Sequence, residues 1–130
     1  MPEGARTDVA ACPGALNDYG ALALVALRHP RDAFASREKI AAEWRALGYH
    51  AAPDFDAAIA EYDAFVAALE ADGAAILWLP GGPRLSIDSL YVRDAAIVVP
   101  GGCAAAAMGK PARAAEPEVA ATAFAAAGVP

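Results

Sequence analysis

The sequence predicts an α/β fold, and three observations lead to that prediction. Two segments place apolar residues at three- and four-residue steps, as one face of an α-helix requires. Several short apolar runs are bounded by glycine or proline, as buried strands are. A helix end, a glycine and an apolar residue occur in the same order at Gly73 and again 55 positions later at Gly128. A repeat of this length indicates a repeated supersecondary unit.

Composition limits the classes of protein to consider. The chain has 130 residues and a formal net charge of -6, and this length suits one domain. Alanine accounts for 38 residues, so the hydrophobic fraction of 58% overstates the number of large core side chains. That fraction still argues against intrinsic disorder. The acidic balance argues against a nucleic-acid partner, because phosphate binding needs a basic surface.

Targeting, membrane and metal signals are missing from the sequence. No apolar run approaches the ~20 residues that a spanning helix needs, and the N-terminus lacks the apolar core of a signal peptide. We therefore expect a cytoplasmic protein without a membrane partner. Two cysteines, Cys12 and Cys103, do not make a disulfide framework. The histidines and cysteines do not fit the usual four-ligand zinc spacing, so we expect no metal and no cofactor.

The first part of the chain is expected to contain a flexible segment, a strand and a helix. Residues 1–16 are turn-rich and are predicted to be flexible, and one domain is predicted over residues 17–130. Ala21–Arg28 is predicted to be a buried strand, because the proline that follows at position 30 disfavours a helix. Ser36 is expected to cap a helix over Arg37–Leu47 that ends at the next glycine.

The second predicted helix has the most regular apolar periodicity in the chain. It begins after Asp54, whose carboxylate suits the positive end of a helix, and ends at Gly73. A strand over Ala74–Leu79 follows, and the Pro-Gly-Gly-Pro segment at 80–83 ends it. Five aromatic side chains in this half are predicted to lie in the core: Trp44, Phe55, Tyr62, Phe65 and Trp78.

Three short strands and a helix are predicted for the rest of the chain. The strands cover Leu90–Val92, Ala95–Val99 and Cys103–Met108, with a Pro-Gly-Gly turn before the last of them. The helix begins near Glu116, with proline in its first turn, and ends at Gly128.

The densest polar cluster is Asp88–Asp94. If this segment is a strand, Asp88, Leu90, Val92 and Asp94 share one face, because strand side chains alternate. Carboxylates on an apolar face need partners when they are buried. One interpretation is a strand edge with solvated charges. The other is a pair of anions directed at a cation, and a guanidinium ion suits this role because its planar fork matches a carboxylate.

A second cluster, Met108–Arg113, contains a Gly-Lys pair but lacks the other residues of a phosphate-binding loop. Lys110 and Arg113 are either part of a solvated basic turn or the residues of an anion-binding site near a helix start.

Two further candidates for a catalytic role are assigned structural roles instead. His29 is expected to be a turn residue bonded to the backbone, and Cys103 a buried, inert thiol.

The order of these motifs resembles that of a known superfamily. The segments 17–20, 27–30, 78–80, 88–94 and 108–113 together resemble the N-terminal half of the guanidino-group-modifying enzymes, the pentein or amidinotransferase superfamily. The nearest resemblance is to bacterial proteins similar to dimethylarginine dimethylaminohydrolase. It covers residues 17–130, and the stretch 88–113 is its specific part. It implies an α/β-propeller built from ββαβ units, of which this chain holds about two, the second truncated.

The resemblance also implies site residues. The guanidinium-binding aspartate of the family falls on Asp94, an upstream substrate-contacting aspartate on Asp88, and an arginine that holds the substrate carboxylate on Arg113. Arg93 stands where dimethylarginine hydrolases usually carry glutamate, and matches the Arg-Asp pairs of arginine deiminases and amidinotransferases. The implied ligand is a small guanidino compound, either arginine or a methylated arginine.

The implied reaction is C–N hydrolysis, in which a cysteine thiolate attacks the guanidinium carbon and forms a thiouronium intermediate. The family's nucleophilic cysteine and catalytic histidine lie beyond the matched half, so we expect no catalytic residue in this chain and no activity of the chain alone. Two alternatives stay open. One is amidino transfer to an amine; the other is a non-catalytic α/β module that binds a cationic ligand or a partner chain. A homo-oligomer is also left open.

Overall fold

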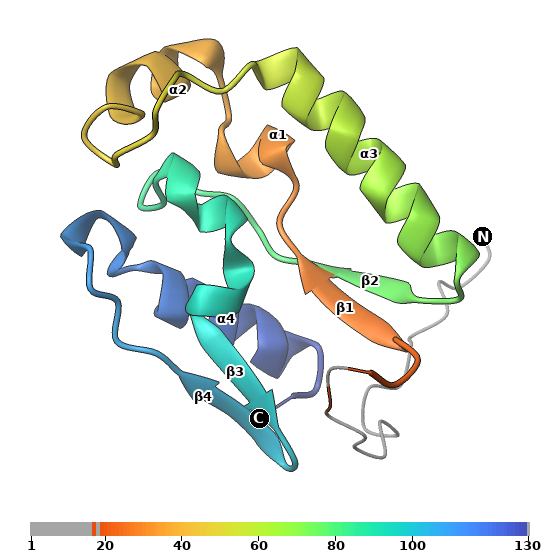
Figure 1. The fold of residues 1–130 in the computed structure, drawn as a ribbon. Coiled ribbons are helices and arrows are strands. Elements are labelled where there is room, and N and C mark those ends of the chain that lie inside the picture. Colours follow the sequence, from red (N-terminus) through yellow and green to blue (C-terminus); the bar gives the residue numbers. More distant parts are fainter. Residues whose placement is uncertain (1–16, 18, 130) are drawn as a thin grey trace, which may run out of the picture.

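The computed structural model of the chain describes residues 17 and 19–129 and confirms the mixed α/β class. Two small sheets lie side by side with helices packed against them (Figure 1). Strand β1 (Leu24–Leu27) pairs in parallel with β2 (Ala75–Trp78), and β3 (Ala96–Val99) pairs antiparallel with β4 (Gly102–Ala105). The N-terminal segment predicted to be flexible lies outside the described residues.

Helices lie between the two strands of the first sheet and after the hairpin of the second. Between β1 and β2 come α1 (Pro30–Ala33), α2 (Arg37–Glu43) and α3 (Phe55–Ala71), and α4 (Glu116–Ala126) follows the β3–β4 hairpin. Within the described residues the sheets stay separate and form no closed ring, so the propeller arrangement stays a prediction. No helix in this part of the chain is long and apolar enough to cross a membrane.

The helix starts follow from local sequence. The Ser36 hydroxyl accepts a hydrogen bond from the Lys39 backbone N–H at 3.1 Å, and the Asp54 carboxylate accepts one from the Ala57 N–H at 2.8 Å. Each cap satisfies a donor that the first helical turn leaves unpaired. Both predicted caps are confirmed.

The glycine repeat corresponds to a repeated helix end. Gly73 and Gly128 have φ values of +94° and +87°, a region that residues with a Cβ atom rarely adopt. In both copies the glycine N–H bonds to the carbonyl three residues earlier, at 3.0 Å. The N–H of the next residue bonds to the carbonyl five residues earlier, at 3.0 Å for Ala74 and 2.8 Å for Val129. The repeat therefore reflects the same capping geometry in both places.

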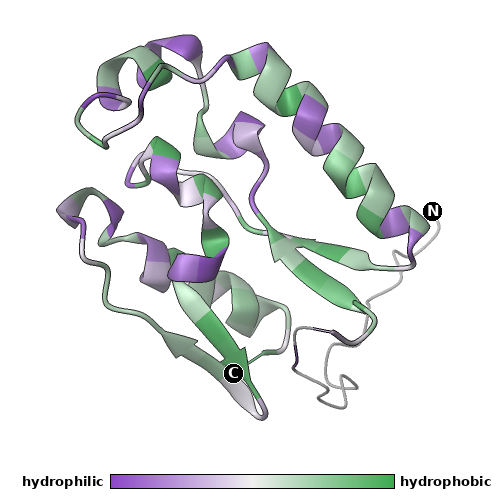
Figure 2. Cartoon of the chain, viewed as in Figure 1, coloured by the Kyte–Doolittle hydropathy of each residue, from purple (hydrophilic) through white to green (hydrophobic). Residues whose placement is uncertain are grey.

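Two groups of buried side chains form the core. The first joins α1, α2 and the segment after β2, and consists of Ala33, Phe34, Ile40 and Ile87. The second consists of Ala95, Ala120 and Phe124, and Ala26 of β1 and Leu77 of β2 pack against it. This second group therefore connects the two sheets through α4. The strands consist mainly of hydrophobic residues, whereas the hydrophilic residues lie on the helices and in the segments that connect them (Figure 2).

The strand expected within Asp88–Asp94 is not present. The chain forms two 3₁₀-helices instead, η2 (Ile87–Leu90) and η3 (Val92–Asp94). Their backbone groups bond three residues apart, as in the Tyr91 N–H to Asp88 carbonyl bond of 3.0 Å. The tight helical rotation means that Asp88 and Asp94 do not share one face with Leu90 and Val92. The predicted strand, with its alternating side chains, is therefore wrong for this segment.

Two of the five aromatic residues expected in the core lie outside it. The Trp78 and Phe65 residues are 44% and 47% exposed, whereas Trp44 and Phe55 pack against the first core group. Trp78 ends β2, whose second edge has no partner strand among the described residues. Its indole instead lies against His29, with ring centroids 5.7 Å apart.

Gly81 permits a close approach between the loop after β2 and α1. A Cβ atom at this position would lie 2.6 Å from the Asp32 carbonyl oxygen, closer than two such atoms can approach. We expect Gly81→Ala to lower the free energy of unfolding by about 1–3 kcal/mol, because the backbone must shift to relieve the overlap. Urea denaturation measures this loss.

Gly82→Ala is the matched control, because nothing lies within 4 Å of the atom that it adds. We expect it to change the stability by about 0.5 kcal/mol or less. Equal losses in both variants would show that loop flexibility, rather than the contact with Asp32, requires glycine here.

Candidate functional site

Asp94 lies at the end of η3, immediately before the second sheet. Its side chain is 55% exposed, and its Oδ2 atom accepts a hydrogen bond from Arg113 Nη1 at 2.7 Å. Its other carboxylate oxygen has no hydrogen-bond partner among the described residues. A carboxylate in this state can accept a further donor from solution.

Arg113 is fully engaged inside the protein. It lies at the end of η4 (Pro111–Arg113), and its Nε and Nη2 atoms donate to the two carboxylate oxygens of Glu116 at 2.7 and 2.8 Å. Nη2 also donates to the Tyr91 carbonyl at 3.1 Å. The two bonds to Glu116, and then the one to Asp94, raise the pKa of the Arg113 guanidinium above its usual range despite its burial. Glu116 itself is completely buried at the start of α4.

Asp88 is buried and also has an internal cation. Lys110 Nζ donates to Asp88 Oδ2 and to the Leu47 carbonyl, both at 2.8 Å. About half of the Lys110 side chain is exposed, whereas that of Asp88 is almost completely enclosed. Lys110 therefore holds the segment after β4 against both Asp88 and the turn after α2.

The structure thus brings together the residues selected from the sequence, but pairs them with one another. Asp88 binds Lys110 and Asp94 binds Arg113. A solvated basic turn is the wrong description of 108–113, because Arg113 is buried. Sequence reasoning did not identify Glu116 as its partner, although the spacing of three residues was a usable signal.

Arg28 is a second buried guanidinium that sequence reasoning missed. It follows β1 and donates through Nε to the Pro80 carbonyl at 2.8 Å and through Nη1 to the Ser89 carbonyl at 2.6 Å. Burial lowers its pKa, and attraction to Glu116 offsets part of this effect. Arg28 therefore ties the end of the first sheet to the residue next to Asp88.

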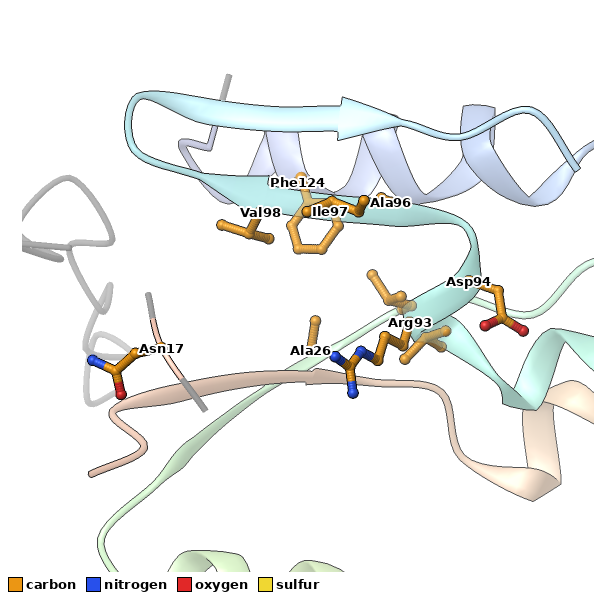
Figure 3. Close-up of a pocket in the computed structure, with 10 residues that line it drawn as sticks. Asn17, Ala26, Arg93, Asp94, Ala96, Ile97, Val98 and Phe124 are labelled. Carbon is orange, nitrogen blue, oxygen red and sulfur yellow. The ribbon is translucent and has the colours of Figure 1, made fainter. Parts of the chain in front are cut away.

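A cavity of about 590 Å³ lies between the two sheets, beside Asp94. Three polar residues line it, Asn17, Arg93 and Asp94, together with apolar side chains from β1, β3 and α4 (Figure 3). The Arg93 side chain extends toward Ala26 of β1, whereas the Asp94 carboxylate lies on the other side of η3, away from Arg93 and Ala26 (Figure 3). Arg93 is exposed and has no hydrogen-bond or ion-pair partner among the described residues. Both charges therefore border one space without bonding to each other.

His29 has the structural role expected of it. Its Nδ1 atom accepts a hydrogen bond from the Arg31 N–H at 3.1 Å, so in the neutral ring Nε2 carries the proton and donates to Asp63 at 2.8 Å. Neither ring nitrogen is left for proton transfer with a ligand. Cys103 is half buried against the second core group, rather than fully buried as expected.

Comparisons with known proteins identify the fold. No family model matches the sequence, and no curated protein matches it. The chain is similar to a crystal structure of dimethylarginine dimethylaminohydrolase, determined as an adduct with 4-chloro-2-hydroxymethylpyridine, with a TM-score of 0.59 and 21% identical residues. The similarity covers 80% of this chain and 37% of that one. The chain thus has a fold like that of part of this enzyme, which confirms the resemblance at the level of fold.

Proposed function

We propose that this chain provides the guanidinium-binding part of an arginine-modifying enzyme similar to dimethylarginine dimethylaminohydrolase. One observation carries the proposal: Asp94 already binds one guanidinium, that of Arg113, through Oδ2 at 2.7 Å. Its exposed side chain keeps a second oxygen for another guanidinium, and it borders a cavity large enough for a small molecule. Arg113 can thus hold the Asp94 carboxylate through Oδ2 while Oδ1 binds the guanidinium of a substrate.

The role of Asp94 in such a reaction is to orient the ligand. Its charge stabilises the guanidinium, and the network of Arg113 and Glu116 fixes the direction of the carboxylate. Asp88 contributes to ligand binding only if its surroundings move, because its side chain is buried and Lys110 already binds its Oδ2 atom. The nucleophile and the acid for C–N cleavage would come from other parts of such an enzyme. The same binding step also serves amidino transfer to an amine.

Substitution of Asp94 tests the proposal through binding, which does not require turnover. We expect Asp94→Asn to weaken the binding of L-arginine about tenfold to a hundredfold, because a charge-assisted hydrogen bond contributes about 1.5–3 kcal/mol. NMR titration of the amide signals of residues 92–98 measures the affinity. The variant keeps the shape of the side chain and removes its charge.

Asp72→Asn is the control for the change in net charge. Asp72 is exposed at the C-terminal cap of α3, and it does not line the cavity beside Asp94. Asp63, also on α3, is unsuitable as the control residue, because it accepts a hydrogen bond from buried His29. Unchanged arginine binding by a folded Asp94→Asn variant would contradict the proposal.

A further inference from the structure

We propose that His29 is a proton-sensitive cap, and that protonation of its imidazole ring releases the start of α1. The residue follows β1, contacts the middle of α3 and is only 5% exposed. An imidazole is the side chain whose charge ordinarily changes between pH 5 and 8. The proposed cap belongs to the first sheet and does not depend on the role of Asp94.

The observed hydrogen bonds of His29 require a neutral ring. His29 is the N-cap of α1, and its Nδ1 atom accepts a hydrogen bond from the Arg31 backbone N–H, which only an unprotonated nitrogen can do. The proton of the neutral ring is therefore on Nε2, which donates to Asp63 Oδ1. A second proton, on Nδ1, would face the Arg31 N–H. Because two donors cannot bond to each other, the cap is then lost.

The side chains that face the ring from α3 and β2 allow it to become charged. The Asp63 carboxylate is largely exposed and already bonds to Nε2, so it stabilises an imidazolium ion without moving. Tyr62 lies edge-on to the ring, with centroids 5.3 Å apart, and burial raises the pKa of its phenol, which therefore stays neutral. Trp78 of β2 also lies against the ring and carries no charge.

The charged residues next to His29 in the chain act in both directions. Arg31 is exposed, and its Nη2 atom lies 3.9 Å from Asp63 Oδ2, so it shares the carboxylate that bonds to the ring. Arg28 is a buried cation, and Asp32 in α1 is an exposed anion. The cations oppose a charge on the ring and the anions favour it, so these effects offset each other in part.

Release of the cap affects the first core group through α1. This helix consists of four residues, too few to be stable alone, so its cap and its packing hold it in place. Ala33 and Phe34, at its end, belong to the first core group together with Ile87, which begins η2. Acid therefore loosens the packing between α1 and η2, and neutral pH preserves it.

NMR of the wild-type chain tests the inference. At pH 8 we expect a proton on Nε2 alone; on acidification Nδ1 should gain one, while the Arg31 amide proton moves upfield with the same midpoint. The Phe34 amide bonds to the Pro30 carbonyl at 2.8 Å, and its protection from hydrogen exchange should fall about threefold to tenfold by pH 5, as loss of a cap implies. A ring that stays neutral to pH 5, a proton on Nδ1 at pH 8, or an Arg31 amide that does not follow the ring would overturn the inference.

His29→Asn keeps a capping side chain that does not titrate, because asparagine is among the preferred N-cap residues. It should leave the protection of the Phe34 amide equal at pH 8 and pH 5. His50→Gln is the matched control, since it removes the other of the two histidines, which is exposed between α2 and α3. It should keep the wild-type loss in acid. A loss of the same size in His29→Asn would assign the response to another group and overturn the inference.

Discussion

Glu116→Gln is expected to lower the free energy of unfolding by about 3 kcal/mol. Glu116 is completely buried and accepts two hydrogen bonds from the Arg113 guanidinium. Removing one partner of a buried ion pair leaves the other charge uncompensated, which costs about 3–5 kcal/mol. Asp94 compensates Arg113 only in part, because it binds through one oxygen and is exposed to water. Urea denaturation followed by circular dichroism measures the change.

Glu118→Gln provides the comparison within the same helical turn. Glu118 binds Arg84 at 2.7 Å, but both side chains are largely exposed, and water screens such pairs. We expect no measurable change in the free energy of unfolding. Similar losses in the two variants would show that the Arg113–Glu116 pair stabilises the fold no more than a surface pair does.

Ile87→Ala should produce the second large loss, about 2–5 kcal/mol. Ile87 is fully buried in the first core group, beside Phe34 and Ile40. Truncation removes apolar contacts and leaves a cavity that the surrounding helices fill incompletely. Because Ile87 begins the segment that carries Asp88, the loss should also appear as faster amide exchange in η2.

Ile97→Ala makes the same chemical change on β3, where the residue is 63% exposed. It should cost about 1 kcal/mol or less, because little apolar surface is returned to water. A loss as large as that of Ile87→Ala would mean that this face of β3 is covered in solution.

Much of the local structure could be predicted from the sequence. The caps at Ser36 and Asp54 and the helix ends at Gly73 and Gly128 depend on hydrogen bonds within five residues, so the local residue types were sufficient. The strands at β2 and β3 were likewise placed to within a residue or two. The motifs at 88–94 and 108–113 pointed to the residues of the candidate site.

The partners of those residues were decided by tertiary structure. Asp94 and Arg113 lie 19 positions apart, and the Arg28–Ser89 bond joins residues 61 positions apart. No local periodicity specifies such pairs, because they form only when the sheets and α4 pack together. The same packing decided that Asp88 is buried while Asp94 is exposed, although both are aspartates in one short polar segment. Local sequence determined where α2 and α3 begin and where α3 and α4 end, since the hydrogen bonds there are short-range. Tertiary packing determined which charges pair with each other and which stay exposed to solvent, since burial depends on segments distant in the chain.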